Sequence, residues 1–413
     1  MSNVRDISLA PLGRQKIAWV KEFMPVLSTL EQRFQQEQPF AGKKIAVSVH
    51  LEAKTAYLCQ VLQAGGAQVC ATGSNPLSTK DEICAALAQS GVEVNAWFGA
   101  TPQEYEEHIR KTLEFCPHII IDDGGDFVGM LHGSHPEYGV NLLGGCEETT
   151  TGIHRLRAKA KAGALRFPMM AVNDADSKHL FDNRHGTGQS VWDGIMHATN
   201  NMIAGKTVVV AGYGFCSSGI ALRAKGMGAN VIVTEVNPFR ALEAAMEGYR
   251  VMPMAEAAPL GDIFVTATGC KDVITKVHFD SMKHNVLLAN AGHFNVEINL
   301  EELSAMAVNM EERKPFIQGY TLEDGRILNV MAEGRLVNIV AGNGHPAEIM
   351  DMSFALQALC ALYLVHHGQA LAPGLYDIPR EIDREVSMMK LAAMGIGLDV
   401  LTLEQQRYLD GEF

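Results

Sequence analysis

The chain has 413 residues, of which 47% are hydrophobic and 20% are charged. This is the composition of a folded protein, and the length exceeds what one hydrophobic core organises, so we expect two or three domains. The formal net charge of −13, with no block rich in Lys or Arg to offset it, argues against nucleic acid or a membrane as a partner.

The first residues and the cysteines indicate the compartment. The stretch MSNVRDISLAPLGRQ carries charges where a signal peptide needs an apolar core, which predicts a cytoplasmic protein. The eight cysteines show no C-x-x-C spacing, so we interpret them as reduced core residues and expect no metal site.

From residue 43 onward, short apolar runs alternate with segments of helical period, which predicts an α/β architecture with parallel sheets. A first group of expected strands comprises residues 44–50, 67–73, 92–99 and 118–123. A region rich in Gly and Thr follows, which we interpret as a loop, and after it we expect one more strand at residues 167–172. A second group of expected strands comprises residues 206–212, 230–235, 262–268 and 285–291. We therefore expect two doubly wound parallel-sheet domains.

The segments between and after these strands predict the domain boundaries. Residues 187–206 have the pattern of a connecting helix. The apolar stretch 354–367 is too short to span a bilayer, and we expect the helix over 347–367 to return to the first domain. The predicted domains are residues 1–185 with 346–375, residues 186–345, and a small helical tail of residues 376–413.

The stretch VVVAGYGFCSSG (208–219) has the order strand, Gly-x-Gly, helix. Gly212 permits a tight turn, Gly214 lets the backbone approach a pyrophosphate, and Ser217 stands where a third glycine is usual. Glu235 ends the next strand, where an acidic residue binds the ribose hydroxyls of NAD and repels the 2′-phosphate of NADP. The pattern favours a Rossmann-like NAD site; the alternative is a Gly-rich turn that binds nothing.

Polar residues also follow the strands of the first domain, at the sheet edge where ligands bind in open α/β folds. His50 follows the first strand, Ser74 and Asn75 follow the second, and Asp122 and Asp123 follow the fourth. Each has a structural alternative, because Asp-Asp-Gly-Gly is also a turn with a helix cap and a single His after a strand is often structural.

Five motifs together resemble the S-adenosylhomocysteine hydrolase family. They are EETTTG (147–152), DSKHLFDN (176–183), AGYG (211–214), NAGHFNVE (290–297) and LVNIVAGNGHP (336–346). The variants HLEAKT, NPLSTKDE and FDNRHGTGQS, and the end at Phe413, resemble its shorter archaeal and thermophilic-bacterial branch, which includes enzymes acting on S-inosylhomocysteine.

The resemblance implies a substrate-binding domain, a Rossmann domain holding one NAD per subunit, a small tail domain, and a homotetramer or homodimer. It also implies a reversible hydrolysis of a nucleosidyl-homocysteine. Oxidation of the ribose 3′-hydroxyl makes the C4′ proton acidic, the thiol is eliminated, water adds, and the ketone is reduced again. The alternatives are an NAD-dependent nucleoside or sugar dehydrogenase and a non-catalytic NAD-binding regulator.

By position, the resemblance implies three sets of site residues. The catalytic set is His50, Asp123, Lys178, Asp182 and His293. The substrate-binding set is Glu52, Lys54, Thr55, Asn75, Glu148, Lys178 and Asp182. The cofactor-binding set is Thr149, Thr150, Thr151, Asn183, Gly212, Gly214, Phe215, Cys216, Ser217, Gly219, Glu235, Arg240, Ala291, Gly292, Asn338 and His345.

Two of these assignments have simpler alternatives. Lys178 and Asp182 are spaced as an i,i+4 ion pair on a helix surface, although a lysine beside a carboxylate in a closed site can also be tuned toward base catalysis. Lys54 stands where better-known adenosyl enzymes of the family carry a glutamate that accepts from the adenine amino group. A lysine only donates, which suits the 6-oxo group of hypoxanthine, unless Lys54 pairs with Glu52 away from the base.

Some positions depart from the better-known members of the family. Thr187 and Ser74 replace cysteines, and Arg240 replaces an asparagine at the adenosine end of NAD. The C-terminus lacks the Lys and Tyr that reach into a neighbouring subunit's NAD site, so we expect NAD to exchange more readily.

Overall fold

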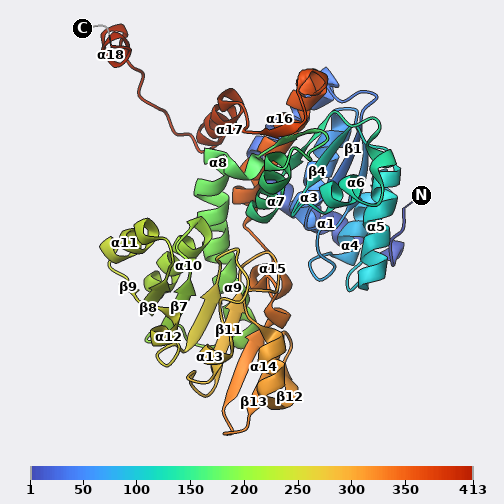
Figure 1. Cartoon of the computed structure of the whole chain (residues 1–413). Helices are drawn as coiled ribbons and strands as arrows, with labels where there is room; N and C mark the ends of the chain where they lie inside the picture. Colours follow the sequence, from blue (N-terminus) through green and yellow to red (C-terminus); the bar gives the residue numbers. More distant parts are fainter. Residues whose placement is uncertain (1, 412–413) are drawn as a thin grey trace.

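The computed structural model describes residues 2–411, which form two α/β bodies joined by helical segments (Figure 1). Two helices precede the first strand, α1 (Ala10–Glu22) and α2 (Pro25–Glu37). Both begin with Pro in their first turn, where its missing N–H costs no hydrogen bond. The predicted fold class, two Rossmann-like α/β units with a helical tail, is confirmed.

The first body contains a sheet of seven parallel strands in the order β15-β6-β5-β4-β1-β2-β3. Their bounds are β1 (Lys44–Ser48), β2 (Gln68–Thr72), β3 (Glu93–Val94), β4 (Ile119–Asp122), β5 (Gly144–Glu147), β6 (Pro168–Met170) and β15 (Gly374–Tyr376). The connecting helices are α3 (Ala53–Ala64), α4 (Asp81–Gln89), α5 (Pro102–Glu114), α6 (Asp126–His132) and α7 (Thr150–Lys161). The central strands are buried along their length, which explains why they read as unbroken apolar runs.

Two expectations for this sheet were wrong. The strand predicted over 92–99 is only two residues long, Glu93–Val94, and Asn95 adds an isolated bridge to Asn3. The region interpreted as a loop contains β5 and α7, and β5 was missed because its glycines have low strand propensity. A Cβ on Gly145 would lie 2.4 Å from Ile120 and 2.6 Å from Met169, so the neighbouring strands leave room only for glycine.

The second body contains an eight-stranded sheet in the order β12-β13-β14-β11-β10-β7-β8-β9. Its strands are β7 (Thr207–Ala211), β8 (Asn230–Thr234), β9 (Arg250–Val251), β10 (Ile263–Thr266), β11 (Val286–Asn290), β12 (Ala307–Lys314), β13 (Ile317–Leu322) and β14 (Ile327–Met331). Its helices are α10 (Phe215–Gly226), α11 (Pro238–Met246), α12 (Met254–Ala257), α13 (Lys276–Phe279), α14 (Leu300–Met306) and α15 (Val337–Val340). The sequence did not predict β12 and β13, which add an antiparallel edge.

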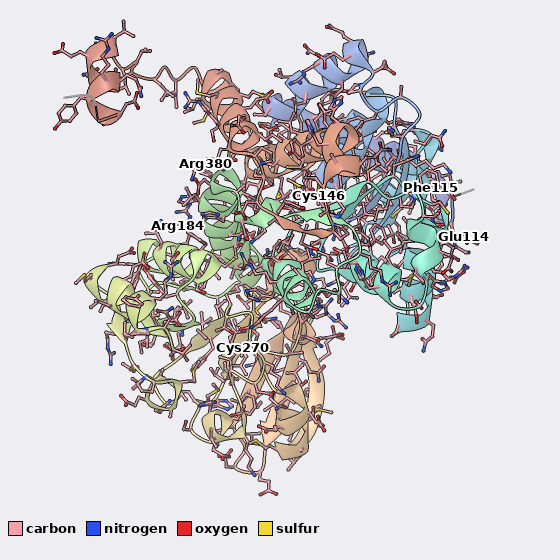
Figure 2. The ribbon with its side chains drawn as sticks, turned by 45° about the horizontal axis from the view of Figure 1, so that its top comes forward. Glu114, Phe115, Cys146, Arg184, Cys270 and Arg380 are labelled. Atoms are coloured by element: carbon pink, nitrogen blue, oxygen red, sulfur yellow. The ribbon has the colours of Figure 1, made fainter. Side chains whose placement is uncertain are left out.

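The link between the bodies is more complex than the single helix predicted over 187–206. It consists of α8 (Asp176–Lys178), a π-helical stretch His179–Gly186, and α9 (Thr187–Thr199). The helix stops seven residues early because Asn200 adopts a left-handed conformation, with φ of 56°. Figure 2 labels Arg184 on this link and Cys146 of β5 in the first body.

The chain then returns to the first body through α16 (Ala347–His367), which packs against α2, α3, β4 and β5. By length and composition the segment Ala347–Ala370 could cross a membrane, but 78% of its most apolar window is buried in the protein. The interpretation as a buried core helix is therefore confirmed. Beyond it, α17 (Arg380–Ala393) packs on α16, and α18 (Leu403–Leu409) stands away from both bodies (Figure 1).

The cysteines only partly match their interpretation as core residues. Cys59, Cys70, Cys84, Cys146 and Cys360 are buried, and Cys116 and Cys216 are partly buried. Cys270 is exposed in the second body (Figure 2), because it lies in the loop that follows β10.

Candidate active site

A cleft lies between the two bodies, at the carboxyl ends of strands from both sheets. Sixteen of the site residues predicted from the sequence line this cleft. They are His50, Glu52, Lys54, Thr55, Asp123, Glu148, Thr149, Thr150, Lys178, Asp182, Asn183, Cys216, Ala291, His293, Asn338 and His345. The others lie outside its lining: Asn75, Thr151, Gly212, Gly214, Phe215, Ser217, Gly219, Glu235, Arg240 and Gly292.

Lys178 lies at the centre of a buried polar cluster. Its Nζ lies 2.8 Å from Asn183 Oδ1, 3.3 Å from Asp182 Oδ2 and 3.5 Å from Glu148 Oε1. Lys178 is 5% exposed and Asp182 is 1% exposed, so the alternative of a surface ion pair is wrong. Burial alone would lower the pKa of Lys178, but the two carboxylates outweigh it and raise that pKa. The lysine is therefore held as an ammonium here. The lowered pKa that a catalytic base would need is not found for Lys178.

The two carboxylates of this cluster differ in charge. Burial would raise the pKa of Asp182, but Lys178 and His345 outweigh it and lower that pKa. Asp182 lies 2.6 Å from His345 Nδ1 and accepts a hydrogen bond of 2.6 Å from Ser353 Oγ. Burial raises the pKa of Glu148 to about 7 against the opposing effect of Lys178. Glu148 is thus the member of the cluster that gains or loses a proton near neutral pH.

A second cluster joins His50, Asp123 and His293 across the cleft. His50 Nε2 lies 3.5 Å from Asp123 Oδ2, and His293 Nδ1 lies 4.0 Å from Asp123 Oδ1. Burial lowers the pKa of His50, although the charge of Asp123 opposes this. Ser74 donates to Asp123 Oδ2 at 2.8 Å, and Ser78 Oγ lies 2.7 Å from His50 Nδ1. His50 and Asp123 therefore form an acid–base pair, and a serine hydroxyl contacts each of the two side chains.

Two further buried carboxyl groups support this edge of the sheet. Asp122 accepts backbone N–H groups of Phe127 and Val128, and burial raises its pKa to about 7. Glu147 accepts the N–H groups of Gly124 and Thr149, which ties the turn after β4 to the start of α7. Burial also raises the pKa of Glu147.

Several partners in the cleft were not predicted from the sequence. Ser353 and Gln357 lie on one face of α16, where Gln357 donates to Glu148 at 2.6 Å. Their i,i+4 spacing within an otherwise apolar helix was the available signal. No comparable local signal points to Ser78.

Lys54 and Glu52 are paired, with Nζ 2.9 Å from Oε2. Lys54 also donates to the carbonyl of Asn343 at 3.2 Å. Lys54 is 6% exposed, and all three residues line the cleft. The pairing that was left as an alternative is therefore present, but it lies in the wall of the cleft.

The turn at 212–219 explains how the motif tolerates the absence of a third glycine. Ser217 is fully buried and donates to the carbonyl of Ala267 at 2.8 Å, so its hydroxyl has a partner. Close packing occurs two residues later, because a Cβ on Gly219 would lie 1.7 Å from the carbonyl oxygen of Arg184. Gly212 has a φ of +92°, the conformation that its tight turn requires.

This turn fits a dinucleotide. Within the described chain the N-cap Gly214 gives α10 no side-chain cap, so the first N–H groups of this twelve-residue helix can receive phosphate oxygens. Glu235 accepts the N–H of Tyr213 at 2.6 Å, which fixes its carboxylate beside the Gly-x-Gly turn. The Arg240 guanidinium lies 5.6 Å from the centre of the Phe215 ring at the same end.

Comparison with known proteins agrees with these features. A family model described as S-adenosyl-L-homocysteine hydrolase matches residues 1–141, and one described as its NAD binding domain matches residues 183–344. S-inosyl-L-homocysteine hydrolase of Methanocaldococcus jannaschii is 54% identical over 410 residues, 99% of both chains. Adenosylhomocysteinase of Pyrococcus abyssi is 54% identical over 407 residues, 98% of this chain and 96% of that one. Adenosylhomocysteinase of Thermococcus kodakarensis is also 54% identical over 407 residues, which are 98% of this chain and 97% of that one.

Proposed function

The chain belongs to the S-adenosyl-L-homocysteine hydrolase family, and from this we propose that it hydrolyses a nucleosidyl-homocysteine thioether, reversibly, to a nucleoside and L-homocysteine with NAD as cofactor. The observation that carries the proposal is the shared cleft. It joins Cys216, in the first turn of α10 next to the Gly-x-Gly turn, to buried acid–base groups at the strand ends of the first body.

NAD supplies the reversible hydride transfer at the 3′ carbon that makes the thioether labile. We assign Lys178 and Asp182 to the 3′-hydroxyl, where the ammonium orients the oxygen and the Lys178–Glu148 contact of 3.5 Å offers a path for its proton. Glu148, with a pKa of about 7, is suited to hold that proton between the two oxidation steps.

We assign His50 and Asp123 to C4′ and C5′, where a proton leaves carbon and the thiol departs. Their 3.5 Å separation lets one accept a proton while the other stabilises the resulting charge. His293, Glu52, Lys54 and Thr55 also line the cleft.

Thiol release tests the function directly. The purified protein should liberate free thiol from S-adenosylhomocysteine or S-inosylhomocysteine, and should form the thioether from homocysteine and the nucleoside. NAD reduction on mixing with nucleoside, without thiol release from either thioether, would instead support a dehydrogenase. Absence of both would support a non-catalytic NAD-binding protein.

We further propose that the inosyl substrate is hydrolysed at least as efficiently as the adenosyl one. Lys54 is a donor in the cleft wall, and its contacts with Glu52 and Asn343 within the described chain use two of its three N–H groups. The third suits the 6-oxo group of hypoxanthine. A mismatched buried polar group costs about 1–3 kcal/mol, which is enough to produce a five- to hundredfold preference in kcat/KM. A clear preference for the adenosyl substrate would contradict this assignment.

We also propose a cytoplasmic homotetramer with the domain boundaries predicted from the sequence. Val400 and Leu403 of the tail are 88% and 82% exposed, which favours burial against another subunit. Light scattering of the purified protein would test the assembly, and a monomer would contradict it.

A further inference from the structure

The loop that follows β2 supplies a buried hydroxyl to each member of the acid–base pair. Ser74 donates to Asp123 Oδ2, and Ser78 contacts His50 Nδ1. We propose that Ser78 is a positioning residue that keeps the Nδ1 of His50 protonated, so that His50 exchanges protons only through Nε2. This inference rests on the proposed function.

The hydrogen-bond partners of Ser78 support this tautomer of His50. Ser78 is fully buried, and its hydroxyl donates to the carbonyl of Asn75 at 2.8 Å. A hydroxyl has one hydrogen to give, so only its lone pairs remain for His50 Nδ1 at 2.7 Å. In this arrangement Nδ1 carries a hydrogen in the neutral ring as well as in the charged one.

The other nitrogen faces the chemistry. His50 Nε2 lies 3.5 Å from Asp123 Oδ2, and both residues line the cleft. With Nδ1 occupied, Nε2 takes the C4′ proton during elimination and gives one proton to the departing thiolate, so that protons balance. The reverse order applies when water adds. A ring with the proton on Nε2 would have no lone pair in the cleft and could not start this sequence.

The loop is anchored to the sheet independently of the reaction. The N–H of Ser74 donates to the carbonyl of Val49 at 3.3 Å, and the N–H of Lys80 donates to the carbonyl of Leu51 at 3.1 Å. The Tyr105 hydroxyl lies 2.8 Å from both the carbonyl of Ser74 and Asp126 Oδ2. The position of the Ser78 hydroxyl is therefore set by the fold and does not depend on a bound substrate.

Ser78→Ala removes this hydroxyl, and Thr79→Val is the matched control. Thr79 is buried in the same turn and also donates to Asn75 O, at 3.1 Å, but it does not line the cleft. In Ser78→Ala we expect kcat for thiol release to fall by about ten- to a hundredfold with little change in KM. NAD reduction on mixing with the nucleoside should continue at the wild-type rate, because oxidation at the 3′ carbon uses the Lys178 cluster. Thr79→Val should keep both rates.

Two comparisons make the result decisive. Ser78→Cys preserves volume with a weaker hydrogen-bonding group, and its thiol-release rate should fall between those of wild type and Ser78→Ala. Retained NAD and an unchanged melting midpoint identify folded variants. Wild-type thiol release in Ser78→Ala, or an equal loss of both half-reactions in folded protein, would overturn the role of Ser78. Absence of thiol release in the wild-type protein would instead overturn the proposed function.

Discussion

Replacing Lys178 with alanine tests the assignment of the 3′-oxidation step. The change removes the cation that lies 3.3 Å from Asp182 and 3.5 Å from Glu148 in a buried cluster. Loss of a positioned acid–base group lowers the rate by a factor on the order of 10² to 10⁴, equivalent to about 3–5 kcal/mol of barrier. We therefore expect turnover to be almost abolished and NAD to remain bound, because Lys178 is not part of the α10 turn.

The same change should also destabilise the fold. Breaking a buried ion pair costs about 3–5 kcal/mol. The lower end is expected here, for two reasons. Asp182 keeps its contacts with His345 and Ser353. Glu148 becomes neutral at pH 7, because its pKa of about 7 is held down by Lys178 and rises when the cation is removed.

Lys390 provides a matched control. It forms a 3.0 Å ion pair with the fully buried Asp351, at the junction of α16 and α17 and outside the cleft lining. Lys390→Ala should lower the melting midpoint to a similar extent while turnover stays within a few-fold of wild type. Thiol release, NAD content and thermal unfolding measured together separate the two effects. A Lys178→Ala protein that keeps most of its turnover would show that Lys178 is only a structural partner.

Three further predictions concern other parts of the protein. Denaturation should release NAD and not NADP, because the Glu235 carboxylate lies beside the Gly-x-Gly turn; stoichiometric NADP would contradict this. Glu148 gives up its proton at about pH 4.5 in the unfolded chain but at about pH 7 when folded, so unfolding releases a proton and stability falls as pH rises through this window, by about 3 kcal/mol. Glu148→Gln should remove that decline, and an unchanged pH profile of stability would refute the assignment. Asp383 accepts the N–H groups of Asp176 at 2.8 Å and Ser177 at 3.0 Å, so it caps the segment that carries Lys178. Asp383→Ala should cost about 1–2 kcal/mol and lower kcat, whereas unchanged kcat would show that the cap does not position Lys178.

Local patterns in the sequence were sufficient for most of the architecture and for part of the candidate site. Buried parallel strands read as apolar runs, so the central strands β1, β2, β4, β7, β8, β10 and β11 were predicted. Strand ends carry ligand-binding residues in this architecture, which placed His50 and Asp123 correctly at one sheet edge. The Gly-x-Gly turn was recognisable because the positive φ of Gly212 favours glycine.

Tertiary contacts decided the rest. Position 145 in β5 accepts only glycine because Ile120 and Met169 leave no room for a Cβ. The residues of β5 by themselves do not indicate this constraint. The charge of Lys178 depends on burial beside Glu148, which lies 30 positions earlier in the chain, and on Asp182. Ser353 reaches Asp182 from a helix more than 150 residues later. Sequence periodicity reports which face of an element is apolar. The pKa and tautomer of a side chain depend on groups brought together by folding, and so only the tertiary structure determines them.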